Sequence, residues 1–122
     1  MDLQGLPVLL VEDEPDSREL LSVVLELCGS RVAAAASVDE ALHRLDAAAP
    51  AVIVSDLSMP GKDGFQLLRA LRNAGNHAPA VAVTGHAYER DRALAAGFAV
   101  FLTKPVEPDV LCSTVAALAP RS

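Results

Sequence analysis

Short apolar runs of strand length alternate along this chain with longer stretches in which apolar residues recur every three or four positions. The runs predict strands at residues 8–11, 31–35, 52–55, 81–83 and 99–103. The stretches between them predict helices at residues 15–28, 38–49, 64–74, 88–96 and 108–118. This alternation is typical of βα units with a parallel sheet. All runs but the second are continuously apolar, as expected for strands that are buried on both faces.

Local signals mark several element boundaries. Pro15 stands where the first turn of a helix tolerates proline, and Gly29 is suited to end that helix. The spacing of Ser37 and Glu40 predicts a capping box. The weakest strand is 31–35, because alanine is a poor strand former.

Composition limits the classes of protein to which the chain can belong. Its 122 residues suit one domain, and a content of 52% hydrophobic but only 3% aromatic residues predicts a core of Ala, Val and Leu. The net charge of −6 argues against direct contact with nucleic acid or an anionic membrane surface. No apolar stretch reaches the length of a membrane span, and no signal sequence is evident. We therefore expect a cytoplasmic location.

The two cysteines, Cys28 and Cys112, lack the spacing of metal ligands. Cysteines in a cytoplasmic domain are most often reduced and behave as small hydrophobic residues. We expect this state for both and assign them no role.

Polar residues follow four of the predicted strands. Glu12 and Asp13 follow the first, Asp56 the third, Thr84 the fourth and Lys104 the fifth. In a parallel sheet these strand ends share one edge, where open α/β sheets bind ligands. The set can hold a divalent cation and a phosphoryl group.

The three carboxylates would repel one another, since two unit charges ~4 Å apart cost about 4 kcal/mol near a protein surface. A shared proton or a bound cation relieves this repulsion, and hard oxygen ligands favour Mg²⁺, with Mn²⁺ as an alternative. Acids beside helix amino termini are the competing interpretation. We prefer that interpretation for Glu14 and Asp16, and we expect Asp63 to be a cap.

Asp56 is the candidate nucleophile, because a carboxylate can form an aspartyl-phosphate; a capping role is the alternative. Lys104 can pair with phosphate or with Asp56, and a cis Lys104–Pro105 bond would aim its side chain. A solvated surface lysine is the alternative. Thr84 can donate its hydroxyl to a phosphoryl oxygen or cap the next helix, and Phe101 is expected in the core.

Four segments in this order and spacing resemble the receiver domain of two-component response regulators. They are residues 9–14, 55–64, 83–84 and 101–105. The resemblance covers essentially the whole chain and implies an α/β fold of the flavodoxin-like (βα)5 type. Its five-stranded parallel sheet would have the order 2-1-3-4-5, an order that the residues themselves do not reveal. We accordingly expect residues 1–122 to form a single receiver domain, with a core of about 7–119 and no output domain.

The resemblance also implies a function. Asp56 would accept a phosphoryl group from the phosphohistidine of a histidine kinase or a histidine phosphotransfer domain. Asp13, Asp56 and the backbone carbonyl of Ser58 would ligate Mg²⁺, with Glu12 acting through a bound water. Lys104 would pair with the phosphoryl group. The domain would catalyse its own phosphorylation and slow dephosphorylation without turning over outside substrates.

Phosphorylation in this family implies a switch. Thr84 would move toward the phosphoryl group and Phe101 would turn inward, changing the surface of the fourth helix, fifth strand and fifth helix. That surface would serve a homodimer or a downstream domain. Ser58 and His86 occupy positions that tune dephosphorylation, and whether His86 orders or obstructs the attacking water stays open.

Several alternatives remain at this point. The opening, residues 3–11, resembles the lead-in to receivers of hybrid sensor kinases, which would make the chain the cytoplasmic part of a membrane-bound kinase; an independent regulator is the other origin. A phosphatase of the haloacid-dehalogenase type would need an acid at Ser58. A nucleotide-binding module would need glycines where residues 12–15 stand. A pseudo-receiver would usually lack an acid or the lysine.

Overall fold

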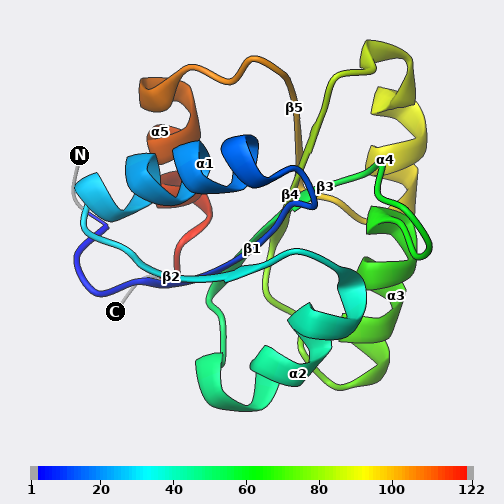
Figure 1. Ribbon diagram of the computed structural model, residues 1–122, viewed down its shortest axis with the longest axis horizontal. Helices are drawn as coiled ribbons and strands as arrows, with labels where there is room; N and C mark the ends of the chain where they lie inside the picture. Colours follow the sequence, from blue (N-terminus) through cyan, green and yellow to red (C-terminus); the bar gives the residue numbers. More distant parts are fainter. Residues whose placement is uncertain (1–2, 121–122) are drawn as a thin grey trace.

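The computed structural model describes residues 3–120 and shows a three-layer α/β arrangement (Figure 1). Its strands are β1 (Pro7–Val11), β2 (Arg31–Ala35), β3 (Val52–Asp56), β4 (Ala80–Thr84) and β5 (Val100–Thr103). Its α-helices are α1 (Pro15–Leu27), α2 (Val38–Ala48), α3 (Gly64–Asn73), α4 (Arg90–Ala96) and α5 (Pro108–Leu118). The strands are all parallel and lie in the order β2-β1-β3-β4-β5, which confirms the expected flavodoxin-like fold.

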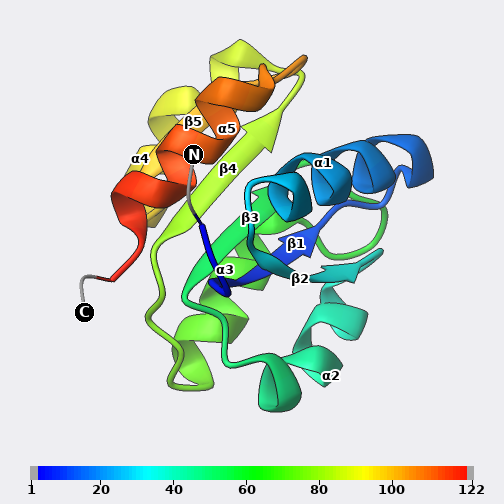
Figure 2. The same ribbon diagram turned by 90° about the vertical axis from the view of Figure 1, so that its left-hand side faces the viewer.

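The sheet is covered on both faces. Helices α1 and α5 lie on one face, and α2, α3 and α4 lie on the other (Figures 1 and 2). Successive side chains of a strand point to opposite faces, so Leu9 joins the core under α2, α3 and α4, whereas Val8 and Leu10 join the core under α1 and α5. Two apolar cores explain why β1, β3 and β4 have to be apolar at consecutive positions.

The alanine-rich strand β2 is the edge strand beside β1. It pairs with β1 from Pro7↔Arg31 to Val11↔Ala35, and of its residues only Ala35 is fully buried. A strand exposed in this way needs less apolar surface, so alanine suffices here. Within residues 3–120, no helix combines the length and apolarity required to cross a bilayer.

The helix starts refine the expected caps. Ser37 caps α2 by accepting the amide of Glu40 at 3.1 Å, but the Glu40 carboxylate accepts from Ala36 rather than from Ser37. The complete capping box occurs instead at α3, between Asp63 and Gln66. Helix α4 begins at Arg90, later than expected, because the preceding residues Ala87–Glu89 form the tighter 3₁₀ turn η1.

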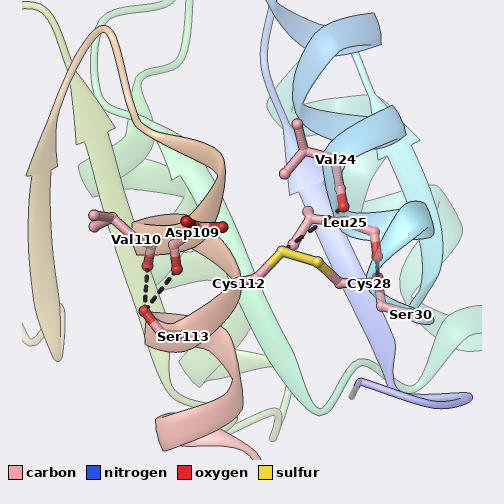
Figure 3. Close-up of a disulfide and its surroundings, with 8 residues drawn as sticks. All are labelled: Val24, Leu25, Cys28, Ser30, Asp109, Val110, Cys112 and Ser113. Carbon is pink, nitrogen blue, oxygen red and sulfur yellow. Dashed lines mark hydrogen bonds between the residues drawn. A yellow bond between two sulfur atoms is a disulfide. The ribbon is translucent and has the colours of Figure 1, made fainter. Parts of the chain in front are cut away.

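The expectation for the cysteines was wrong, because Cys28 and Cys112 form a disulfide (Figure 3). Cys28 follows the last residue of α1, Cys112 lies in α5, and their Cα atoms are 6.6 Å apart. The two residues are 84 positions apart in the sequence. Only the strand order brings α1 and α5 together on one face, and this order is not visible in the sequence.

Candidate functional site

Acidic and basic side chains from three strand ends meet at the carboxyl edge of the sheet. One carboxylate oxygen from each of Glu12, Asp13 and Asp56 lies within 4.8 Å of the other two. Lys104, directly after β5, places its Nζ 3.2 Å from Oδ2 of Asp56 and also bonds to Oε1 of Glu12. Glu12 and Asp56 are only 1% and 8% exposed, so their charges are poorly solvated.

The first turn of α1 orients the acid pair that follows β1. The guanidinium of Arg18 donates to the carbonyl oxygens of Glu12 and Asp13, at 2.9 and 3.2 Å. Ser17 donates its hydroxyl to Oε1 of Glu12 at 2.8 Å. Glu14 caps the helix by accepting the amides of Asp16 and Ser17, in agreement with the capping interpretation.

Ser17 and Arg18 were missed in the sequence. The only sequence feature that could have indicated their role is their position about one helical turn after Glu12 and Asp13. Many surface residues have a similar position relative to an acid.

A close backbone approach fixes the turn that follows Asp56. The amide of Ser58 donates to Oδ1 of Asp56 at 3.0 Å, so Asp56 also serves as a turn cap. Gly64, the first residue of α3, lies so close that a Cβ there would be 2.4 Å from the carbonyl oxygen of Asp56. Glycine is therefore the residue that lets α3 begin against the end of β3.

Thr84 is fully buried at the end of β4. Its hydroxyl donates to Oε1 of Glu89 at 3.0 Å and accepts the amide of His86 at 3.3 Å. The next helix is not capped by Thr84, because the N-cap residues of η1 and α4 are His86 and Glu89, and neither has a side-chain cap hydrogen bond. Phe101 is 8% exposed and belongs to the core, as expected.

The remaining candidate residues follow the ends of β3 and β4. The side chains of Ser58 and His86 are both exposed. The Lys104–Pro105 peptide bond is cis. The structure thus brings together Glu12, Asp13, Asp56 and Lys104, with Thr84 and Phe101 beneath the same edge.

Burial and mutual contact shift the ionisation of the central groups. Burial is the largest cause that raises the pKa of Asp56 to about 6, and hydrogen bonding with Glu12 adds to it. Burial also acts to raise the pKa of Glu12, but hydrogen bonds with Asp56, Lys104 and Ser17 outweigh it and lower the pKa. The pKa of Lys104 is raised despite its burial, because it faces both carboxylates.

The donor set fits a hard divalent cation. Carboxylate oxygens from Glu12, Asp13 and Asp56 are close enough to share one ion, and the pocket offers no nitrogen or sulfur ligand among the residues that the structure describes. Mg²⁺ and Mn²⁺ prefer such oxygen ligands.

Glu12 and Asp13 follow β1, and Asp56 ends β3. The strand order reverses between these two neighbouring strands. Doubly wound α/β domains bind their ligands at this switch point, so fold and site together define a doubly wound domain with an acidic site at its carboxyl edge. The chain belongs to the response regulator receiver domain family, whose profile matches residues 8–116.

Individual relatives differ in length. An uncharacterized 14.6 kDa protein of Leptolyngbya boryana is 44% identical over 110 residues, which cover 87% of this chain and 84% of that protein. The sensor histidine kinase RcsC of Salmonella typhimurium is 37% identical over 93% of this chain, which spans only 12% of that protein. The transcriptional regulatory protein DctD of Pseudomonas aeruginosa is 39% identical over 88% of this chain, which spans 24% of it.

Solved structures agree with the fold. The chemotaxis protein CheY4 of Vibrio cholerae superposes with a TM-score of 0.87 at 30% identity, over 93% of this chain and 98% of that one. A response regulator from Chloroflexus aurantiacus gives a TM-score of 0.86 at 29% identity, over 94% of this chain and 98% of that one.

Proposed function

We propose that Asp56 accepts a phosphoryl group from the phosphohistidine of a histidine kinase or a histidine phosphotransfer domain, with Mg²⁺ or Mn²⁺ as cofactor. The observation that carries this proposal is the position of Asp56 between the Lys104 ammonium and the acids Glu12 and Asp13 at the switch point of the sheet. Membership of the receiver family supports a signalling role as phosphoacceptor rather than turnover of outside substrates.

Each residue then has a defined task. An oxygen of Asp56 attacks phosphorus while the bond from phosphorus to the donor nitrogen breaks, and Lys104 pairs with the phosphoryl oxygens. Asp13, Asp56 and the Ser58 carbonyl would hold the cation, and Glu12 would hold it through water. Bound there, a cation would supply positive charge that offsets the charge of the phosphoryl oxygens. Ser58 and His86 tune hydrolysis of the aspartyl-phosphate.

Phosphorylation would be read out through Thr84 and Phe101. The Thr84 hydroxyl leaves Glu89 and donates to the new phosphoryl group, because the phosphoryl group carries more negative charge than the Glu89 carboxylate and is the stronger acceptor. Phe101 moves with it, and the surface of α4, β5 and α5 changes. This surface would control a second copy of the chain or a downstream domain.

Residues 1–122 would act as one receiver domain on the cytoplasmic side, either free or as part of a sensor kinase. Two relatives, the sensor histidine kinase RcsC and the sensor protein EvgS, support the second arrangement. A disulfide in that compartment is usually reversible.

The test is the intact mass of the protein after incubation with acetyl phosphate and Mg²⁺. We expect one added phosphoryl group that hydroxylamine removes. The variant Asp56→Asn should keep its fold, checked by circular dichroism, and gain no adduct. An adduct of equal yield on the variant would move the acceptor elsewhere, and no adduct on the wild type with either acetyl phosphate or a phosphorylated kinase would refute the proposal.

A further inference from the structure

The disulfide joins the two helices whose starts adjoin the candidate site. Helix α1 follows the acid pair directly, and its Ser17 and Arg18 bond to that pair. Helix α5 follows Lys104 after a short segment. A movement of α5 relative to α1 therefore changes the relation between Lys104 and the acids.

Apart from the disulfide, the contact between α1 and α5 is apolar. Leu21 and Leu25 of α1 share a core with Leu111 and Val115 of α5. Among residues 3–120, no ion pair joins the two helices, and the only polar contact of their side chains is Cys112 Sγ at 3.7 Å from the Val24 carbonyl oxygen (Figure 3). Aliphatic surfaces can slide over one another, so the covalent bond is the directional restraint between these helices.

The two cysteines differ in exposure. Cys112 is 1% exposed, whereas Cys28 is only partly buried at the end of α1. Cys28 is therefore the residue at which a small thiol would attack. The chain has two cysteines in all, so no other pairing within the chain competes.

We propose that Cys28 and Cys112 form a thiol–disulfide exchange site for a low-molecular-weight thiol and its disulfide, and that the state of this site sets the rate at which Asp56 is phosphorylated. The second half rests on the proposed function. In reduction, a thiolate attacks the Cys28 sulfur, the bond to Cys112 breaks, and the Cys112 thiolate leaves and takes a proton from solvent. A second thiolate then attacks the outer sulfur of the mixed disulfide and releases Cys28.

The net reaction balances. Two molecules of small thiol become one small disulfide, and the protein disulfide becomes two thiols. Oxidation is the reverse, with the small disulfide as oxidant.

The disulfide should slow phosphorylation of Asp56. Lys104 is paired with Glu12 and Asp56, and it must turn from them to the incoming phosphoryl group. The disulfide restrains α5, and with it the segment that carries Lys104. The oxidised domain therefore takes up the phosphoryl group more slowly, and we expect at least a threefold difference in rate.

The experiment equilibrates the folded protein in glutathione buffers that range from fully reduced to fully oxidised. Thiols are counted by alkylation and intact mass, and the rate of phosphorylation by acetyl phosphate with Mg²⁺ is measured for each state. Expected are two alkylated thiols in the reduced buffer, none in the oxidised one, and the slower rate in the second.

Variants supply the control. The single variants Cys28→Ser and Cys112→Ala cannot form the disulfide, so each should be phosphorylated at the rate of the reduced wild type in both buffers. Because Cys28 is only partly buried, Cys28→Ser should disturb folding less than Cys112→Ala.

Two outcomes overturn the proposal. If the bond opens only after the protein is unfolded in guanidinium, no exchange site exists. If exchange occurs but both states react at equal rates, the coupling is wrong. Failure of both states to take any phosphoryl group would refute the proposed function, while the thiol count would still decide the exchange.

Discussion

Asp56 lies beside one acidic and one basic side chain, Glu12 and Lys104. Whether Asp56 itself is ionised decides whether the site can bind a cation. Burial and the contact with Glu12 raise its pKa to about 6, while Lys104 holds an ammonium within 3.2 Å. A proton and a divalent cation therefore compete for one carboxylate. Without a cation, the folded form binds this proton more tightly than the unfolded chain does. The contribution of Asp56 to stability is then fully present below pH 3.8 and declines as the pH rises through about 6.

We predict that Mg²⁺ binds more weakly in acid. Because Asp56 must lose its proton to become a ligand, the apparent affinity at pH 5 should be about tenfold lower than at pH 8. Binding that stabilises only the folded state raises the melting temperature, so the Mg²⁺-induced shift in melting temperature measures the affinity at each pH. Asp56→Asn serves as control and should lose most of this pH dependence; an equal shift at both pH values would contradict the prediction.

The elements divide into those that the sequence predicts and those that depend on distant neighbours. Asp56 and Lys104 could be found because each follows an apolar run, and parallel strands bring such ends to one edge. Arg18 could not be found, since nothing local distinguishes a helical arginine that turns back to a strand end from one in solvent. Two further details could not be predicted, because they depend on the backbone geometry of single residues. They are the hydrogen bond from the Ala36 amide to Glu40 and the 3₁₀ turn before α4.

The contact between α3 and β3 gives a prediction for Gly64. The change Gly64→Ala would place a methyl group against the backbone of Asp56 and Leu57, and such overpacking costs about 1–3 kcal/mol of unfolding free energy. The matched control is Gly85→Ala, where the methyl group meets nothing within 4 Å and a change of less than about 0.5 kcal/mol is expected. Urea denaturation measures both. Equal stability of the two variants would show that the turn after Asp56 yields freely.

At the scale of the whole molecule, two apolar cores on either side of one sheet hold the fold together, and a single covalent link joins the helices over one of them. That link spans 84 positions and restricts the unfolded chain far more than the folded one. Its contribution should therefore appear mainly as a loss of freedom in the denatured state.

We predict that reduction of the disulfide lowers the free energy of unfolding by about 2–4 kcal/mol, the typical contribution of a disulfide bond to stability. Urea denaturation with and without a strong reductant measures the difference. The double variant Cys28→Ser, Cys112→Ala should unfold at the same midpoint in both conditions. A wild-type midpoint that ignores the reductant would show that the link adds no stability.

The disulfide also closes a covalent ring that contains β2 to β5, whereas β1, which lies between β2 and β3 in the sheet, is outside it. A protease that cuts once within the ring, for example in the turn at residues 58–62 beside the site, cleaves a peptide bond without separating the pieces. The nicked protein should run as one species in non-reducing electrophoresis and as two after reduction. The two fragments, one with Asp56 and the other with Lys104, would stay covalently linked. This receiver could therefore be made as a split domain whose two parts are held together by one disulfide bond.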